Sequence, residues 1–321
     1  MGLVFQLLMA PQKCNAVGES GDDIAMPNDN DQVLRSLNSL IADGYDRVPY
    51  DPPASPGLDP EQVFALAATY GHGRDHRGID VLDLGCGTGA QLERAAGLTT
   101  GKLVGTDLSR AAYAKAAART ARFGSRLRMM CADFMDLDAD QLGRFDLIYH
   151  IGVLYVTPPA VQRRLLELIA DCLKPGGVAV ISYYAGTVPL LMAGLHKVLR
   201  ASADPNEGAS DQIRAAKAQV QTMLATIAKV GGERLMSAVL QQVYATEDTI
   251  FYHEMLNQSF AALSTSALET ALGARGVHFL NWMQPAPFEK DAPPRMRALM
   301  ADAYTFAGGG YFYGVFCKTG Q

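Results

Sequence analysis

A glycine cluster that follows an apolar run constrains the fold of this chain more than any other feature. Residues 79–84 read IDVLDL, a strand pattern, and the next six residues read GCGTGA. Gly85, Gly87 and Ala90 fit the spacing G-x-G-x-x-[G/A], in which glycines permit a tight turn from strand to helix and a close approach of backbone to ligand. The spacing alone does not identify the ligand. It predicts a binding loop at the carboxyl edge of a parallel sheet.

Apolar segments of strand length alternate with amphipathic helical segments along much of the chain. Near-continuous apolar strands between such helices are typical of a parallel sheet that is covered on both faces. Ser109 is expected to cap the helix after the second strand, and Ser266 and Glu269 fit a capping box. The expected strands are 79–84, 102–108, 126–133, 144–152, 178–185, 277–283 and 310–319.

These patterns divide the chain into four parts. We expect an N-terminal arm over 1–60, rich in Gly, Pro, Asn and Asp, with one short helix near 31–42. A cofactor-binding core follows over 61–187. Residues 188–262 show helical periodicity without a strand and are expected to form a helical insertion. Residues 263–321 supply the last helix and strands, which complete the sheet.

Acidic residues close three successive strands, and their charge helps to identify the ligand. Asp83 lies two positions before Gly85, and Asp107 and Asp133 end the second and third strands. A dinucleotide would bring an anionic pyrophosphate to Asp83, whereas S-adenosylmethionine brings an ammonium and a sulfonium. Opposite charges a few ångström apart in a partly dry cleft contribute on the order of 1–4 kcal/mol. The acids therefore favour S-adenosylmethionine, although Asp107 alternatively caps the next helix and Asp133 alternatively starts a turn.

The strand-end motifs together resemble those of the class I S-adenosylmethionine-dependent methyltransferases. The matching segments are VLDLGCGTG (81–89), GTDLS (105–109), CADF (131–134), FDLIYHIGVLYV (145–156) and LKPGGVAVISYY (173–184). The resemblance implies an α/β, seven-stranded Rossmann-like sheet of order 3-2-1-4-5-7-6 with strand 7 antiparallel. S-adenosyl-L-homocysteine would be the product. The expected cofactor-binding residues are Asp83, Gly85, Cys86, Gly87, Asp107, Leu108, Asp133, Phe134 and His150.

Three shorter segments carry a narrower resemblance. YDRVPYDPP (45–53), HIGVLYVTPP (150–159) and FYHEML (251–256) resemble bacterial methyltransferases with a helical methyltransferase regulatory domain. Some members of that group methylate protein lysines. The resemblance implies that the helical insertion lies above the carboxyl edge of the sheet, as a lid or a substrate wall.

Several side chains are candidates for a direct part in methyl transfer. His150 is either a base or a provider of its backbone carbonyl to the amino group of the cofactor, and Tyr155 is expected to face the substrate. Tyr45 and Tyr50 either orient a nucleophile with their hydroxyls or anchor the arm by apolar contacts. Because Tyr183 and Tyr184 are consecutive at the end of a strand, one should point into the cleft and the other into the core.

Composition excludes several classes of partner. The chain has 28 Lys and Arg against 33 Asp and Glu, a net charge of −5, and no basic run, which disfavours nucleic acid and anionic membranes. Five cysteines without paired spacing favour a reducing compartment, and no basic region precedes the apolar N-terminus. We therefore expect a cytoplasmic protein. No metal is expected, because His72 and His76 lie in a glycine-rich loop.

The sequence predicts an enzyme that moves a methyl group from S-adenosyl-L-methionine to a nitrogen or oxygen nucleophile. The acceptor is a small metabolite or an amino-acid side chain, with a small-molecule substrate favoured over a protein. Two alternatives stay open: an NAD(P)-dependent oxidoreductase, and a non-catalytic regulatory protein that binds the cofactor or its product. The helical insertion is a candidate surface for a homodimer.

Overall fold

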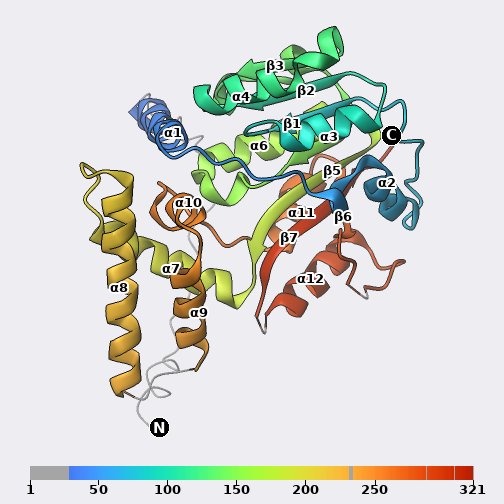
Figure 1. Ribbon diagram of the computed structural model, residues 1–321. Coiled ribbons are helices and arrows are strands. Elements are labelled where there is room, and N and C mark those ends of the chain that lie inside the picture. Colours follow the sequence, from blue (N-terminus) through green and yellow to red (C-terminus); the bar gives the residue numbers. More distant parts are fainter. Residues whose placement is uncertain (1–28, 231–233, 287, 307, 321) are drawn as a thin grey trace.

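The computed structural model describes residues 29–321, apart from residues 231–233, 287, 307 and 321. Residues 1–28 of the expected N-terminal arm lie outside these residues. The centre of the structure is a seven-stranded sheet with the order β3-β2-β1-β4-β5-β7-β6 (Figure 1). The strands are β1 (Val81–Leu84), β2 (Leu103–Asp107), β3 (Leu127–Cys131), β4 (Phe145–His150), β5 (Leu173–Ala185), β6 (Val277–Trp282) and β7 (Gly310–Lys318).

The pairing of the strands confirms the predicted topology. Strands β1 to β5 pair in parallel, while β7 runs antiparallel to both of its neighbours, β5 and β6. The carboxyl ends of the first five strands therefore meet at one edge of the sheet. This edge holds the loops that follow the strands and thus most of the polar side chains singled out above.

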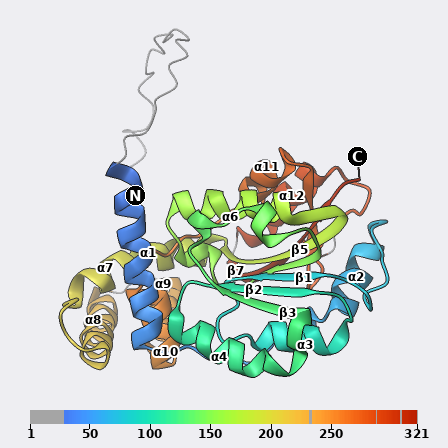
Figure 2. The ribbon, with the colours of Figure 1, turned by 90° about the horizontal axis from the view of Figure 1, so that it is seen from above.

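Helices cover both faces of the sheet. α3 and α4 lie on one face, and α6, α11 and α12 lie on the other (Figure 2). The helices around the sheet are α2 (Pro60–Ala68), α3 (Ala90–Leu98), α4 (Arg110–Thr120), α5 (Ala139–Leu142), α6 (Pro159–Cys172), α11 (Thr265–Gly273) and α12 (Pro294–Thr305). The 3-10 turns are η1 (Pro56–Leu58), η2 (Ala121–Arg126), η3 (Phe134–Asp136) and η4 (Leu154–Val156).

Successive side chains of the strands point alternately into two apolar cores, one on each face of the sheet. Val81 and Tyr149 pack with Leu92 of α3, whereas Leu82 and Ile148 pack into the cluster formed with α6. Successive side chains of a strand point to opposite faces, so a strand that is apolar at every position fits a sheet covered on both sides. This explains why these strands read as unbroken apolar runs in the sequence.

Capping contacts show where the sequence placed helix ends correctly and where it did not. The Ser109 hydroxyl accepts a hydrogen bond from Ala112 N at 3.0 Å, which confirms the predicted cap of α4. The predicted capping box at Ser266 and Glu269 is wrong. Helix α11 is capped instead by Ser264, because the Glu269 carboxylate turns to β6 and accepts a hydrogen bond from Phe279 N at 2.7 Å.

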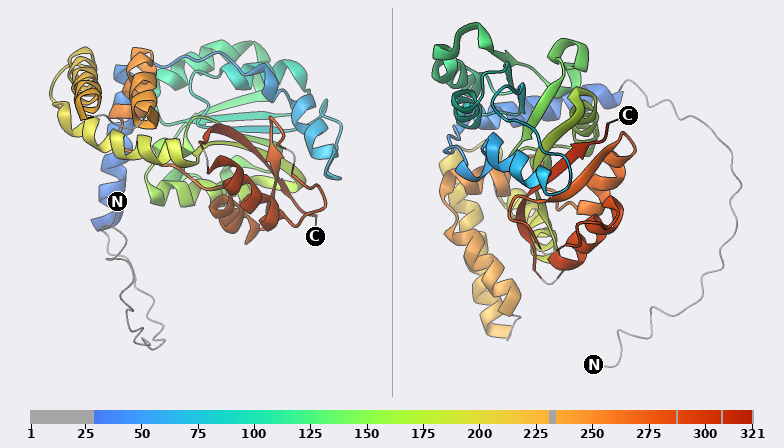
Figure 3. Two further views of the ribbon diagram at one scale, coloured as in Figure 1. Left: turned by 90° about the horizontal axis from the view of Figure 1, so that it is seen from below. Right: turned by 90° about the vertical axis from the view of Figure 1, so that its right-hand side faces the viewer.

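A block of helices is inserted between β5 and α11 and extends beyond the sheet (Figures 1 and 3). It comprises α7 (Thr187–Ser202), α8 (Ala209–Val230), α9 (Arg234–Ala245), α10 (Asp248–Phe251) and the π-helical turn η5 (Tyr252–Leu256). We call residues 187–256 the helical block. Its members share an apolar core of their own that includes Leu199, Val220, Leu240 and Phe251.

The N-terminal helix is longer than the sequence pattern indicated. A helix was expected near 31–42, and α1 spans Asp29–Arg47. It lies beside the helical block and reaches the ends of β2 and β3 (Figure 2). The Asn38 amide donates to both carboxylate oxygens of Asp133, at 2.8 and 3.0 Å, so the helix is anchored to the sheet edge. Within the part of the chain described, no helix is both long and apolar enough to cross a membrane.

Candidate functional site

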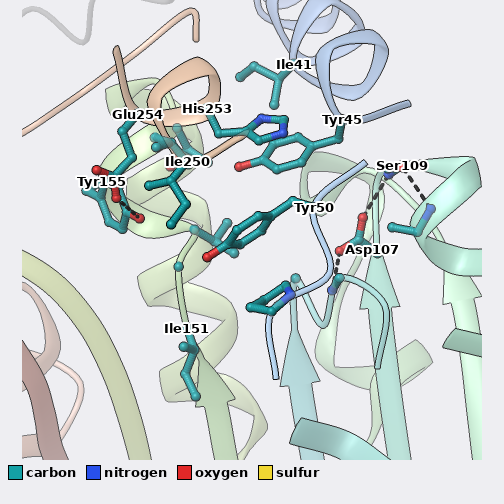
Figure 4. Close-up of a pocket in the computed structure, with 18 of the residues that line it drawn as sticks. Ile41, Tyr45, Tyr50, Asp107, Ser109, Ile151, Tyr155, Ile250, His253 and Glu254 are labelled. Carbon is teal, nitrogen blue, oxygen red and sulfur yellow. Dashed lines mark hydrogen bonds between the residues drawn. The ribbon is translucent and has the colours of Figure 1, made fainter. Parts of the chain in front are cut away.

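A cavity of about 640 Å³ lies at the carboxyl edge of the sheet, beneath α1 and the helical block (Figure 4). Its walls come from the loops after β1, β2, β3 and β4, from residues 49–55, from the helical block and from the start of β7. The structure thus brings together most of the residues predicted from the sequence. Lining residues include Asp83, Gly85, Cys86, Gly87, Asp107, Leu108, Asp133, Phe134, Tyr45, Tyr50 and Tyr155.

The loop after β1 is held in place by its neighbour β2. The amides of Gly85 and Cys86 both donate to Thr106 O at 2.9 Å, and the Gly87 amide donates to the Asp107 carboxylate at 2.7 Å. Gly85 has a φ of +81°, and a Cβ at this position would lie 2.5 Å from a methyl carbon of Val153. Only glycine fits here, because a side chain would meet both backbone strain and a steric clash.

Asp83 is a buried carboxylate that faces the cavity without a compensating partner. The residue is 2 % exposed, and no hydrogen bond or ion pair reaches its side chain from the described residues. Burial, with the nearby Asp107 charge, raises the pKa of Asp83 to about 8. A lone carboxylate in such surroundings is costly unless a cation approaches it. The Asp83 carboxylate therefore suits a positively charged ligand in this part of the cavity.

Asp107 is positioned by two backbone amides. One carboxylate oxygen accepts from Gly87 N at 2.7 Å and the other from Ser109 N at 2.9 Å. Burial raises the pKa of Asp107, and the amide contacts oppose that shift. The alternative in which Asp107 caps α4 is wrong, since Ser109 fills that position. The carboxylate is fixed at the cavity wall with lone pairs left for a hydroxyl-bearing ligand.

Asp133 has the local role that the alternative interpretation gave it, and it also lines the cavity. Its carboxylate accepts a hydrogen bond from Met135 N at 2.9 Å and starts the turn η3. The same carboxylate holds Asn38 of α1. Asn38 itself lines the cavity and was missed in the sequence, because nothing in a polar N-terminal arm marks one asparagine as a partner of the third strand.

The structure does not bring the His150 side chain into the cavity. The side chain is fully buried beneath the loop, and its Nδ1 lies 2.8 Å from Leu84 O. Burial lowers the pKa of His150 to about 4, so the ring is neutral at pH 7. Its edge packs against Phe134, with ring centroids 6.3 Å apart. A ring that is buried behind the cavity wall and has a lowered pKa does not suit the role of base, and the backbone role stays a prediction.

The opposite side of the cavity is built from aromatic side chains near a further carboxylate, that of Glu254. Glu254 of η5 accepts hydrogen bonds from the hydroxyls of Tyr184 at 2.9 Å and Tyr155 at 3.4 Å. Burial raises the pKa of Glu254, and the two hydroxyls oppose this. Tyr183, by contrast, is buried in the core, as expected for one of two consecutive strand residues. Nothing in the sequence marks Glu254 as a site residue, because its partners lie far away along the chain.

Tyr45 and Tyr50 lie between the two carboxylate-bearing sides. Tyr45 is stacked on His253, with ring centroids 4.1 Å apart and planes 7° apart. Burial raises the pKa of Tyr45, and the negative charges of Asp107 and Glu254 raise it further. The ring is therefore close enough to both carboxylates to be affected by their charge. In Figure 4 the hydroxyl ends of Tyr45 and Tyr50 point to the side of Glu254 and away from Asp107.

Comparisons with known proteins agree with this architecture. A family model described as "Methyltransferase domain" matches residues 81–177. An uncharacterized protein, RP028, of Rickettsia prowazekii is 30% identical over 155 residues, which cover 47% of this chain and 60% of that protein. The carboxy-S-adenosyl-L-methionine synthase of Wolinella succinogenes is 31% identical over 105 residues, which cover 32% of this chain and 42% of that protein.

A solved structure extends the likeness to most of the chain. PKMT2 from Rickettsia typhi in complex with AdoHcy (S-adenosylhomocysteine) superposes with a TM-score of 0.70 at 17% identity, over 84% of this chain and 55% of that one. At this identity the likeness shows a shared fold. The chain spans about half to three-fifths of the length of RP028 and PKMT2. The motifs, strand order and matched domain together establish that this chain carries a class I methyltransferase domain, whose cofactor is S-adenosylmethionine.

Proposed function

We propose that this chain transfers a methyl group from S-adenosylmethionine to a nitrogen or oxygen nucleophile of a small molecule or an amino-acid side chain. The observation that carries the proposal is the unpaired Asp83 carboxylate beside the Gly85–Gly87 loop, in a cavity that continues to the tyrosines around Glu254. A cation site and an aromatic compartment in one cavity suit a charged cofactor and a separate acceptor.

The cofactor-binding roles divide among the strand ends. Asp83 supplies negative charge for the cationic part of the cofactor, and Asp107, held by Gly87 N and Ser109 N, offers lone pairs to its ribose hydroxyls. Asp133 and Phe134 provide the wall for the adenine. S-adenosylmethionine supplies an electrophilic methyl group, whose bond to sulfur breaks, with its electrons left on sulfur, as a nucleophile's lone pair bonds to the carbon. The protein aligns the acceptor and excludes water.

The cover over the cavity supports a small acceptor. Tyr45 and Tyr50 contribute from the N-terminal side, while Ile250 and Glu254 contribute from the helical block. A free small molecule, or one extended side chain, is the size of acceptor that this enclosure favours. The homodimer and the cytoplasmic location stay predictions.

Calorimetric titration with S-adenosylhomocysteine, S-adenosylmethionine and NAD+ tests the cofactor. We expect both sulfur compounds to bind with Kd on the order of micromolar, about −8 kcal/mol, and NAD+ to bind far more weakly. Binding of NAD+ alone would overturn the proposal in favour of an oxidoreductase.

Incubation of the protein with methyl-labelled cofactor and fractionated cell extract tests catalysis. We expect label to appear in small solutes. Label on macromolecules would instead assign an amino-acid side chain as the acceptor. Tight cofactor binding without transfer to any fraction would favour the non-catalytic regulatory alternative.

A further inference from the structure

Glu254 is a partly buried acid that lacks a cationic partner. It lines the cavity, and none of the Lys, Arg and His side chains in the described ranges forms an ion pair with it. Its hydrogen bonds come from the neutral hydroxyls of Tyr184 and Tyr155. Two hydroxyls only partly offset the cost of burying a carboxylate, whereas a cation in contact with it offsets far more. The negative charge of Glu254 is therefore not fully compensated by its neighbours.

Three tyrosines that line the cavity beside this carboxylate pack against one another and form what we call the tyrosine cage (Tyr155, Tyr184 and Tyr311). The ring centroids of Tyr155 and Tyr184 are 4.8 Å apart and nearly perpendicular, and Tyr311 lies 5.0 Å from Tyr184 and 5.8 Å from Tyr155. The Tyr311 hydroxyl is held by Ser182 at 2.7 Å. The faces of aromatic rings attract cations, and ammonium ligands are commonly held by aromatic side chains grouped in this way.

The charged side chains that line the rest of the cavity are also mostly acidic. Asp83, Asp107, Asp133 and Glu254 line it, and Lys115 is the one Lys or Arg among the described lining residues. An anionic acceptor would meet repulsion throughout this space, and a neutral alcohol could donate a hydrogen bond to a carboxylate but would gain no attraction between opposite charges. A cationic acceptor would be attracted both by the cavity as a whole and by the tyrosine cage in particular.

We propose that the methyl acceptor is an amine that enters as its ammonium ion, and that Glu254 with the tyrosine cage is the subsite that binds it. This inference rests on the methyl transfer proposed above. Glu254 lies across the cavity from Asp107, with Tyr45 and Tyr50 between the two (Figure 4). An amine held at Glu254 is therefore inside the same enclosure as the residues assigned to the cofactor.

Glu254 also provides an acceptor for the proton that an ammonium must lose before it can be methylated. The carboxylate takes one proton from the bound ammonium and leaves a neutral amine with a free lone pair. That pair forms the new nitrogen–carbon bond as the sulfur–carbon bond of the cofactor breaks, and the product is a methylammonium ion. Burial raises the pKa of Glu254, which makes it a better proton acceptor than an exposed glutamate.

A matched pair of probes tests the subsite without knowledge of the natural acceptor. Benzylammonium and benzyl alcohol have nearly the same shape and differ in charge. Each is titrated by calorimetry into the full chain saturated with S-adenosylhomocysteine. We expect the ammonium to bind at least tenfold more tightly than the alcohol. We expect Glu254→Gln to bring this ratio near one, and Glu254→Asp, which keeps the charge, to retain part of it.

The control is Glu207→Gln, which removes an exposed carboxylate from the same helical block and should leave the ratio unchanged. Equal binding of the two probes, no binding of either, or a ratio that survives in Glu254→Gln would overturn the amine subsite. If Glu254→Gln lowers the thermal stability while the ratio is unchanged, Glu254 is only structural. Failure of the wild-type chain to bind S-adenosylhomocysteine would instead overturn the proposed function itself.

Discussion

The two sides of the cavity are built in different ways. The side formed by β1, β2 and β3 uses residues at the carboxyl ends of these strands. Two of its carboxylates are held by backbone amides, that of Asp107 by Gly87 N and Ser109 N and that of Asp133 by Met135 N. The side formed by Glu254 and the tyrosine cage uses side-chain contacts between segments that lie up to 129 residues apart. One side is a local backbone arrangement, and the other depends on the assembly of the whole fold.

This difference predicts separate responses to mutation, and the largest concerns Asp107→Ala. We expect the affinity for S-adenosylhomocysteine to fall by about 1,000-fold or more, about 4 kcal/mol, because the loop loses an anchor and the ligand loses an acceptor. Calorimetry measures the loss, and benzylammonium should still bind the cofactor-free variant as it binds the cofactor-free wild type. Asp140→Asn, an exposed acid of α5, is the control. Retained affinity in Asp107→Ala would contradict the assigned role.

The next effect is on stability and concerns Gly85→Ala. A Cβ at this position combines a φ of +81° with a contact of 2.5 Å to Val153. We expect a loss of about 2–3 kcal/mol in the free energy of unfolding, measured in urea. Gly97→Ala is the matched control, because Gly97 lies in α3 and a Cβ there meets nothing within 4 Å. The control should be neutral or slightly stabilising. Equal unfolding midpoints for the two variants would show that the loop is not strained by a side chain.

A smaller effect is a pH dependence that arises at Asp83. Its pKa is about 8 in the folded chain, above the value of about 3.8 that serves for the unfolded chain. Between these values the folded state binds the extra proton, so the stability contributed by this group is full below pH 4 and is lost as the pH rises towards 8. Asp83→Asn should remove this part of the pH dependence, about 2 kcal/mol between pH 5 and pH 6.5, in urea titrations of the cofactor-free chain at these two pH values.

The protonation of Asp83 also determines how the affinity for the cofactor depends on pH. A cation favours the ionised form of Asp83, so the affinity for S-adenosylmethionine should rise from pH 5 to pH 8. The product lacks the sulfonium charge, and its affinity should rise less. Affinities for both compounds that are flat with pH would show that Asp83 does not meet the charged part of the cofactor.

The smallest effect concerns Tyr184→Phe, which changes the other side of the cavity alone. Loss of the 2.9 Å hydrogen bond to Glu254 should reduce the stability by about 1 kcal/mol. Binding of S-adenosylhomocysteine should be unchanged. Tyr244→Phe is a control in the same helical block, since that residue is 38% exposed and its hydroxyl accepts a hydrogen bond from Gln221. A large loss of cofactor affinity in Tyr184→Phe would show that the two sides are not separable.

The contrast between the two sides also explains what the sequence predicts. The glycine spacing and the acids after three strands follow from local rules, and with the family resemblance they predict the sheet order and one wall of the cavity. Local rules cannot predict the roles of Glu254 and Asn38, because their partners are tyrosines and an aspartate that only the tertiary fold brings near. His150 looks like a site residue from its position at the carboxyl end of β4, yet its ring lies against Leu84 O and is buried.

The π-helical turn η5 has a consequence for motion. It presents two consecutive residues to the cavity, and His253 stacks on Tyr45 of α1 while Glu254 contacts Tyr184 of β5. One peptide unit therefore links the N-terminal helix to the edge of the sheet. We therefore expect that a displacement of α1 would disturb the His253 stack and, through that peptide, the position of the Glu254 carboxylate, which would connect access to the cavity with its affinity for an amine.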